Sequence, residues 1–200
     1  MQTHLAIARK THPEPVPAVT PDMALSGIHH ITGITDDLEQ AHDFYAGVLG
    51  LPVVKKTLNQ DDGKTEHWFW ARYDGDRVGD HSAMTLFGWP GSDYRARPGA
   101  GQTHHIAFRA KDRDEQDAWR AHLADHGIEA TPILDRQYFE SIYFRSPDGL
   151  LCEIASDVEG FDVDEAVAEL GRGLKLTDWL EPGRDEIEAA LTPLGAGADR

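Results

Sequence analysis

The sequence contains almost no cysteine and no long hydrophobic run. Cys152 is the only cysteine among the 200 residues, which excludes an intramolecular disulfide framework and favours a reducing compartment. No apolar run approaches the ~20 residues that a membrane-spanning helix requires. The first residues also lack the apolar stretch of a secretory signal. These absences predict a cytoplasmic protein that has no membrane partner.

Basic charge is scarce as well. The chain has 19 Lys and Arg residues against 35 Asp and Glu residues, which gives a formal net charge of −16. A nucleic-acid partner requires a basic surface to meet its phosphate backbone, so this composition argues against one. With 40% hydrophobic residues, the chain nevertheless has enough apolar side chains for a globular core.

A repeat organises the chain. Residues 30–44 read HITGITDDLEQAHDF and residues 105–119 read HIAFRAKDRDEQDAW, at a constant offset of 75 residues. Each copy begins as a short strand and turns helical after an aspartate, Asp37 or Asp112, that can cap the helix. Each copy is therefore the start of one structural unit.

Strands follow each predicted helix. We expect them at 51–58, 66–73 and 82–89 in the first copy, and at 128–134, 140–145 and 150–155 in the second. Each copy is thus a β-α-β-β-β unit, and the fold class is α+β. The predicted boundaries are a disordered leader over 1–23, a first unit over 24–90, a linker over 91–102, a second unit over 103–157 and a C-terminal helical arm over 158–200. Helical pieces of the arm are expected at 164–171 and 183–191.

Paired histidines open both repeats, as His29-His30 and His104-His105. Neighbouring side chains of a strand point to opposite faces, so the two members of a pair cannot both reach one point. His30 and His105 fall on the smaller and more polar face of their strands. Two equivalent histidines on equivalent strands could meet in a shared cup, which makes these two the first candidate metal ligands.

Glu153 is the third candidate ligand. It is the one charged residue of the apolar strand 150–155, and a buried carboxylate is costly unless it is paired or binds a cation. A hairpin centred on Asp148 places Tyr143 opposite Glu153 on the same face of the sheet. The corresponding strand of the first copy, 83–87, has no carboxylate, which predicts three protein ligands rather than four.

Two imidazoles and one carboxylate with open positions suit an Fe(II) ion that also binds O₂ and a substrate. Mn(II) is compatible with the same ligands, and zinc also occurs with two histidines and a glutamate. Cys152 is interpreted as a small core residue. Ordinary core or surface roles are expected for His42, His67, His81, His122, His126, Trp68 and Trp70.

The duplicated unit resembles the vicinal oxygen chelate superfamily, which includes glyoxalases and extradiol dioxygenases. The resemblance rests on HHI at the start of each unit, an FY helix, LG after that helix, and PDG before the strand that carries Glu153. Longer stretches resemble the hydroquinone-type ring-cleaving dioxygenases: GIHHITGITDD, FYAGVLGLPVVKKTLNQDD, GQTHHIAFRAKD, TPILDRQYFESIYFRSPDGLLCEIASD and GFDVDEAVAELGRGLKLTDWLEP. Members of that family are longer, with four such units, whereas here a half that resembles the first unit runs directly into a half that resembles the last.

The resemblance implies a fold and a site. Two βαβββ repeats would form a vicinal-oxygen-chelate cup, with His30, His105 and Glu153 as metal ligands. Catalytic roles are implied for His29, Thr32, His104, Arg136 and Tyr143. The implied activity is a metal(II)-dependent ring cleavage that inserts O₂ into a hydroquinone-type or catechol-type aromatic diol, with Fe(II) or Mn(II) as cofactor. In that scheme Arg136 and Tyr143 stabilise charge on oxygen, and His29 or His104 moves the phenolic proton.

Two other functions remain open on the same scaffold. An O₂-independent glyoxalase-like isomerase or thiol transferase would need a metal but no O₂, although the missing carboxylate in strand 83–87 counts against the four-ligand site usual in glyoxalases. A non-catalytic module that binds a small molecule would not need three metal ligands. The open edges of paired sheets favour a homodimer.

Overall fold

The computed structural model describes residues 25–93, 95–157 and 160–191. Within these ranges, the contacts group residues 25–157 into one compact unit and residues 160–191 into another. The predicted leader over 1–23 lies outside the described residues. None of the helices in the described ranges is long and apolar enough to cross a membrane.

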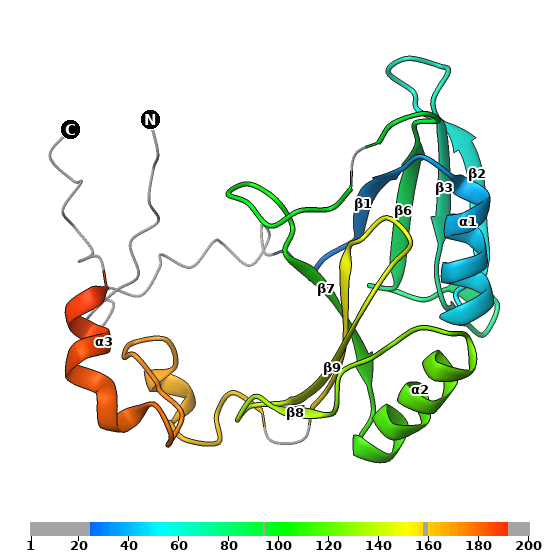
Figure 1. The fold of residues 1–200 in the computed structure, drawn as a ribbon. Helices are drawn as coiled ribbons and strands as arrows, with labels where there is room; N and C mark the ends of the chain where they lie inside the picture. Colours follow the sequence, from blue (N-terminus) through cyan, green and yellow to red (C-terminus); the bar gives the residue numbers. More distant parts are fainter. Residues whose placement is uncertain (1–24, 94, 158–159, 192–200) are drawn as a thin grey trace, which may run out of the picture. The chain divides into compact units, whose positions relative to one another are not determined.

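The first repeat forms a mixed four-stranded sheet in the order β1-β6-β3-β2 (Figure 1). Its strands are β1 (His30–Thr35), β2 (Val53–Leu58), β3 (Glu66–Trp70) and β6 (Ala83–Gly88). β1 and β6 run parallel, and the other neighbours are antiparallel. The strand expected over 66–73 ends early at Trp70. Its last part instead forms a separate ribbon of β4 (Tyr73–Asp74) and β5 (Arg77–Val78), with Gly75 at a positive φ of 60° in the turn between them.

The second repeat forms an equivalent sheet in the order β7-β10-β9-β8. Its strands are β7 (His105–Ala110), β8 (Leu134–Asp135), β9 (Glu140–Arg145) and β10 (Leu151–Ser156). The strand expected over 128–134 is wrong for most of its length, because only β8 pairs regularly with β9. Pro132 has no N–H to continue a ladder, and the partner of the Tyr143 N–H is the side-chain hydroxyl of Thr131.

Each repeat places one helix after its first strand, as predicted. The helix α1 (Leu38–His42) continues as a π-helix, η2 (Asp43–Val48), and α2 spans Arg113–Asp125. The expected caps are confirmed, since Asp37 accepts from the Gln40 N–H at 2.9 Å and Asp112 accepts from the Glu115 N–H at 3.0 Å. The first helix ends before Gly50, whose φ of 67° suits a residue that follows a helix C-terminus.

The helices lie against a core that both repeats share. Phe44 in η2 contacts the ring of Phe144 in β9, with centroids 6.3 Å apart, and Tyr45 contacts Trp70 in β3. Nε2 of His122 in α2 lies 2.8 Å from the carbonyl oxygen of Val48. The two repeats therefore pack through the helix-bearing sides of their sheets. The predicted core residues Trp68, Trp70 and Cys152 are all confirmed as buried.

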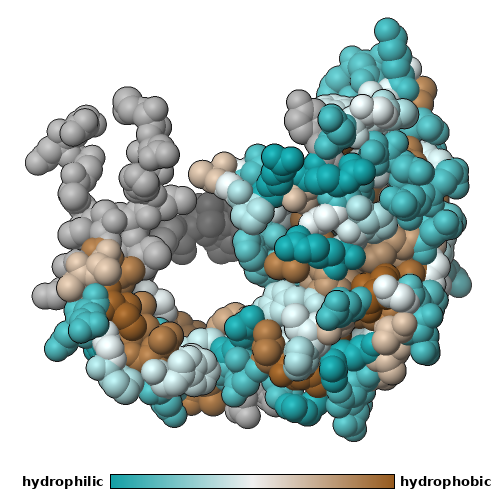
Figure 2. Space-filling view, in the orientation of Figure 1, coloured by the Kyte–Doolittle hydropathy of each residue, from teal (hydrophilic) through white to brown (hydrophobic). Residues whose placement is uncertain are grey.

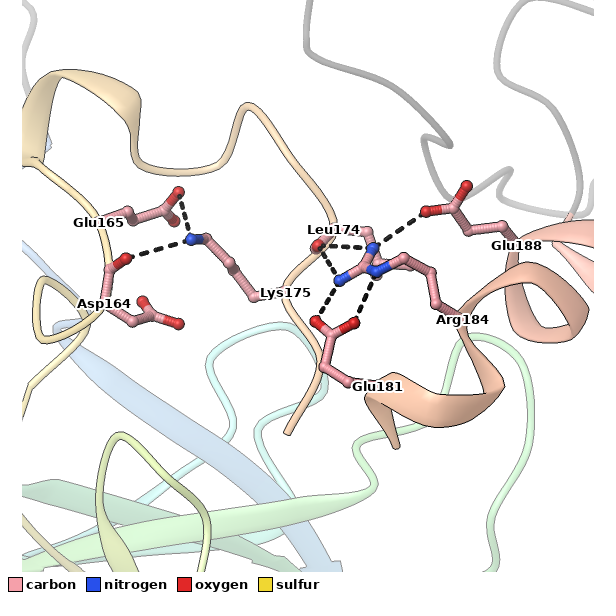
Figure 3. Close-up of polar contacts among 7 residues, drawn as sticks. All are labelled: Asp164, Glu165, Leu174, Lys175, Glu181, Arg184 and Glu188. Carbon is pink, nitrogen blue, oxygen red and sulfur yellow. Dashed lines mark hydrogen bonds and ion pairs between the residues drawn. The ribbon is translucent and has the colours of Figure 1, made fainter. Parts of the chain in front are cut away.

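The C-terminal unit contains η3 (Val167–Glu169), η4 (Glu181–Gly183) and α3 (Arg184–Ala190). The helix expected over 183–191 is confirmed as α3, whereas the one over 164–171 is reduced to η3. Polar contacts hold the segment together locally: Lys175 donates to the Asp164 carbonyl and pairs with Glu165, and Arg184 pairs with Glu181 and Glu188 (Figure 3). Apolar side chains gather on its surface (Figure 2), among them Phe161, Val163, Val167, Leu170, Trp179 and Leu180.

Candidate metal centre

Each sheet has one side that packs on the helices and one side that does not. In the first repeat, the side away from the helices carries His30, and we call it the His30 face. Its side chains follow from the strand pairing: His30, Thr32, Ile34, Ala83, Thr85, Phe87, His67 and Phe69. The predicted alternation of β1 is confirmed, because His30, Thr32 and Ile34 are exposed whereas Thr35, on the opposite side, is buried.

The second repeat has the equivalent Glu153 face. It is made of His105, Ala107, Arg109, Leu151, Glu153, Ala155, Ser141 and Tyr143. The predicted hairpin register is confirmed, since Tyr143 lies directly opposite Glu153. Cys152 points to the other side and is fully buried, and this burial raises the pKa of its thiol to about 12.

Glu153 is the most strongly held polar group of this face. Its carboxylate is only 2% exposed, and Oε1 accepts hydrogen bonds from the hydroxyls of Ser141 and Tyr143, the latter at 3.0 Å. Its second oxygen, Oε2, lies 2.9 Å from Nε2 of His105. A buried carboxylate and an imidazole nitrogen therefore converge on one point, as two ligands of a common cation would.

The two histidine pairs share one geometry, which the alternation argument did not foresee. Nδ1 of His29 lies 2.8 Å from Nδ1 of His30, and the same two atoms of His104 and His105 are also 2.8 Å apart. The ring centroids are 5.1 Å apart in both pairs. The expectation that pair members cannot reach one point is wrong here. The reason is that β1 begins at His30 and β7 at His105, so the preceding histidine lies outside the strand.

The contact within each pair fixes which nitrogen remains available. Nδ1 of His30 and of His105 contacts the neighbouring ring, which leaves Nε2 of each as the nitrogen that could bind an ion; in His105 this nitrogen already contacts Glu153. Outer groups that contact the second nitrogen of a histidine ligand commonly orient its ring. The sequence supported His29 and His104 only through family resemblance, and the matching geometry now gives both a physical role beside the candidate ligands.

Arg136, Tyr143 and Thr32 complete the predicted residues. The guanidinium of Arg136 lies over the ring of Tyr143, 5.2 Å from its centroid, and the Tyr143 hydroxyl in turn contacts the Glu153 carboxylate. Thr32 lies on the His30 face, where its hydroxyl accepts a hydrogen bond from Thr85 at 2.8 Å. The structure thus places Arg136, Tyr143, His104, His105 and Glu153 in one group, and His29, His30 and Thr32 in another.

His67, for which an ordinary core or surface role was expected, lies close to the candidate ligand His30. It lies on the His30 face between the rings of Phe69 and Phe87, and its Nε2 is 2.9 Å from the Thr85 hydroxyl. Burial and the nearby His30 lower its pKa. The alternation of side chains in β3 explains this position. Trp68 and Trp70 lie on the core side of the sheet, so His67 and Phe69 lie on the His30 face.

The strand register shows how the two faces correspond. His30 pairs with Ala83 and His105 with Leu151, so Thr85 occupies in the first repeat the place that Glu153 occupies in the second. By the same register, His67 corresponds to Ser141. The two residues make equivalent contacts: His67 contacts the Thr85 hydroxyl, and the Ser141 hydroxyl contacts Glu153. The absence of a carboxylate opposite His30 agrees with a set of three ligands.

Within one chain, however, the three predicted ligands do not meet. No group of three His, Cys, Asp or Glu side chains among the described residues is arranged to hold a metal ion. A pocket of about 870 Å³ lies between the repeats and is lined by residues from both sides of the sheets, among them His29 and His30 but neither His105 nor Glu153. His105 and Glu153 form one half of the predicted set, and His30 stands apart on the other face.

Comparison with known proteins defines the class. The chain belongs to the Glyoxalase/Bleomycin resistance protein/Dioxygenase superfamily, whose family model matches residues 27–154. Solved structures support the same fold: a domain of this family from Frankia sp. EAN1pec has a TM-score of 0.56 at 17% identity, and covers 67% of this chain and 99% of its own. The predicted superfamily and α+β fold are thereby confirmed.

Two curated relatives lie within the same class. The chain is 36% identical over 177 residues to the protein named "Putative ring-cleaving dioxygenase MhqO" of Bacillus subtilis, which covers 88% of this chain and 52% of that protein. It is 32% identical over 179 residues to the chlorohydroquinone/hydroquinone 1,2-dioxygenase of Sphingobium indicum, over 86% of this chain and 50% of that protein. The chain thus spans about half the length of these relatives.

Proposed function

We propose that this chain is a metal(II)-dependent ring-cleaving dioxygenase that acts on an aromatic diol of hydroquinone or catechol type. The observation that carries the proposal is the buried Glu153 carboxylate, held by Ser141 and Tyr143 and 2.9 Å from Nε2 of His105. The names of the relatives from Bacillus and Sphingobium support the reaction and the substrate class.

The proposed ligands are His30, His105 and Glu153. Their donor set fits Fe(II), with Mn(II) as a compatible alternative. When bound, such an ion supplies adjacent open positions for the diol and O₂ and a path for electrons between them. The chain's own part is to hold the ion, to orient the diol and to place polar groups at its oxygens.

The histidine pairs determine where protons lie around this site. A ring that ligates through Nε2 carries its hydrogen on Nδ1, so Nδ1 of His105 donates to Nδ1 of His104. The hydrogen of the neutral His104 ring then lies on its Nε2, and the same holds for His29 beside His30. His29 and His104 are therefore donors toward a substrate oxygen. This assignment gives His29 and His104 a donor role within the expectation that one of them moves the phenolic proton.

Arg136 and Tyr143 lie where charge on the diol would be stabilised. The Tyr143 hydroxyl donates to Oε1 of Glu153, which fixes both the tyrosine and the carboxylate. The Arg136 cation over the tyrosine ring favours negative charge on a nearby oxygen. Together with the two donor histidines, these groups would stabilise a diol that binds in deprotonated form.

Oxygen consumption tests the proposal. Protein loaded anaerobically with Fe(II) is mixed with hydroquinone, methylhydroquinone or catechol, and we expect O₂ uptake with a ring-opened product. Glu153→Ala should lose the metal because it removes a ligand. Tyr143→Phe should keep the metal and lose turnover by roughly 10²-fold, the order expected when one stabilising donor is removed. Tyr73→Phe is the matched control, since Tyr73 is exposed on β4 and should leave both properties unchanged.

The outcomes separate the competing functions. Bound Fe(II) without O₂ uptake would contradict the dioxygenase and favour an O₂-independent isomerase or a binding module of the same fold. Full metal content in Glu153→Ala would overturn the ligand assignment. Loss of the metal in Tyr143→Phe would show that this hydroxyl supports the site and does not act on the substrate.

A further inference from the structure

A chain of three hydrogen-bonded side chains crosses the first sheet on the His30 face. Nε2 of His67 in β3 lies 2.9 Å from the Thr85 hydroxyl in β6, and that hydroxyl donates to the Thr32 hydroxyl in β1 at 2.8 Å. Thr85 is fully buried, whereas Thr32 is exposed. The chain therefore runs from an imidazole, through a buried hydroxyl, to the side chain of an exposed residue.

The direction of these bonds follows from the hydrogens available. A hydroxyl has one hydrogen, and that of Thr85 goes to Thr32, so the contact with His67 is a bond that Thr85 accepts. His67 therefore carries its ring hydrogen on Nε2 and donates it. Within the described part of the chain, the Thr32 hydroxyl accepts from Thr85 and donates to no residue, so its own hydrogen is left for a bound molecule.

The ring of His67 is held in the position that this direction requires. It lies between the rings of Phe69 and Phe87, whose centroids are 4.2 and 4.1 Å from its own. Burial and, after it, the nearby His30 lower the pKa of His67, so the ring is neutral at neutral pH and has one hydrogen. A neutral imidazole packed between two phenyl rings has little freedom to turn Nε2 away from Thr85.

The second repeat has a shorter version of this chain. It runs from the Ser141 hydroxyl to the candidate ligand Glu153 and ends there, because the position equivalent to Thr32 is Ala107. In the first repeat the chain continues to Thr32, the next side chain after His30 on that face. Since the fold accepts an alanine at this position, the packing of the sheet does not require the extension to Thr32.

We infer that His67 is a positioning residue of the proposed reaction: through Thr85, it fixes the Thr32 hydroxyl as a hydrogen-bond donor to an oxygen of the aromatic diol. This role rests on the proposed function and adds to it the group that orients one substrate contact. A donor whose hydrogen is already directed outward does not have to reorient when the diol binds, and it favours the diol in deprotonated form.

A double-mutant cycle between His67 and Thr32 tests this role. His67→Phe keeps three stacked rings but removes the N–H donor, and we expect kcat/KM for O₂ uptake with the diol to fall roughly 3- to 10-fold, the order expected for one lost hydrogen bond. Thr32→Val should lose at least as much. In the Thr32→Val background, His67→Phe should cause no further loss, because His67 acts only through that hydroxyl. Equal losses in both backgrounds would overturn the inference.

Two further variants separate positioning from packing. His67→Gln retains an amide N–H that can donate to Thr85, and it should recover part of the activity that His67→Phe loses. His126→Phe is the matched control, since His126 is an exposed histidine at the end of α2, and it should leave kcat/KM unchanged. All these variants should keep the metal content of the wild type because none removes a proposed ligand. If His67→Gln is no more active than His67→Phe, the donor does not matter and the inference fails.

The tautomer of His67 can be read without metal or turnover. In the metal-free protein, NMR of the ring nitrogens distinguishes a hydrogen on Nε2 from one on Nδ1, and the spectrum of His67→Phe assigns the signal. We expect the hydrogen on Nε2. A hydrogen on Nδ1 would make His67 the acceptor from Thr85 and would overturn the inference whatever the activity.

Failure of this role and failure of the proposed function give different results. A metal-loaded wild type that consumes no O₂ with hydroquinone, methylhydroquinone or catechol would overturn the proposed function. An active wild type in which the losses from His67→Phe and Thr32→Val are additive would overturn the role of His67 alone.

Discussion

At the scale of single residues, the two histidine pairs show how a local contact can prepare a ligand. His104 and His105 have the same Nδ1–Nδ1 distance as His29 and His30, although the sheets around them differ. The contact leaves Nε2 of His105 pointing at Glu153. An imidazole whose second nitrogen is already held loses less rotational freedom when it binds an ion.

This contact predicts the effect of His104→Ala. Without the neighbouring ring, His105 loses its orienting partner, and we expect Mn(II) affinity to fall by roughly 10- to 100-fold while the fold is retained. His104→Asn keeps a side-chain oxygen that can accept from Nδ1 and should recover part of the loss. Titration calorimetry with Mn(II) measures both. Equal affinity in all three proteins would show that the pair does not orient the ligand.

For single residues, the sequence predicted several side-chain positions correctly and failed to predict one contact. Strand alternation correctly placed His30, and a hairpin centred on Asp148 correctly paired Tyr143 with Glu153. It could not predict the contact between His29 and His30, because alternation constrains only residues inside a strand. The position of His67 near His30 was not predicted, because a single histidine carries no pattern of its own.

At the scale of elements, the helix of the first repeat approaches its sheet at a glycine. A Cβ atom at Gly88 in β6 would lie 2.5 Å from Cδ1 of Leu38 in α1 and 3.0 Å from its Cγ. Leu38 is itself 8% exposed and belongs to the shared core. The distance between α1 and β6 is therefore set by the absence of a side chain at Gly88.

Gly88→Ala should force the two elements apart. We expect the free energy of unfolding to fall by about 1–3 kcal/mol, as for other overpacked cores. Leu38→Ala should cost about 2–5 kcal/mol alone, and the double variant should cost less than the two changes combined, since the alanines relieve each other. Gly47→Ala is the control, because nothing lies within 4 Å of its added Cβ, and it should gain about 0.5–1 kcal/mol. Urea unfolding measures all four, and strict additivity would disprove the steric contact.

The elements that the sequence misjudged have local causes. The expected strand over 128–134 fails at Pro132, which cannot donate to a ladder. The first repeat was predicted to turn helical after Asp37 as one element, but its helix changes to a π-helix at Asp43. Apolar spacing does not distinguish these two helix types over so few turns, because both bury Phe44 and Tyr45 on the same side.

At the scale of the whole molecule, the sequence predicted two similar repeats, and the family resemblance placed His30, His105 and Glu153 in one cup between them. The pattern of apolar residues defines a core side and a ligand side for each sheet, but it does not state which sides meet. The packing is decided by contacts between residues far apart in sequence, such as Phe44 with Phe144 and Thr35 with Asp148. The sequence proposes three ligands in one cup, whereas the described residues of one chain do not bring these three together.

Asp148 makes the contact between the repeats sensitive to pH. It is 9% exposed, and burial raises the pKa of its carboxyl above the ordinary value, although the hydrogen bond from Thr35 opposes that shift. Asp36 and Asp37 also raise this pKa, whereas Arg95 lowers it. A carboxyl with a raised pKa binds more protons in the folded state than in the unfolded state, so its contribution to stability is largest at low pH and declines as pH rises through the raised value.

Asp148→Asn should remove this decline, because the amide oxygen still accepts from Thr35 and carries no charge. We expect the variant to gain stability relative to the wild type as pH rises from about 4 toward 7, with the difference levelling off once the wild-type carboxyl is fully ionised. Asp62→Asn is a control whose stability difference from the wild type should change with pH in the opposite direction. Hydrogen bonds from Thr65 and Lys64 lower the pKa of Asp62 to about 2. That variant should be less stable than the wild type near neutral pH, and the deficit should shrink as pH falls below about 4. Urea unfolding at a series of pH values measures both differences. A constant difference for Asp148→Asn across the series would show that the buried carboxyl does not link the packing of the two repeats to pH.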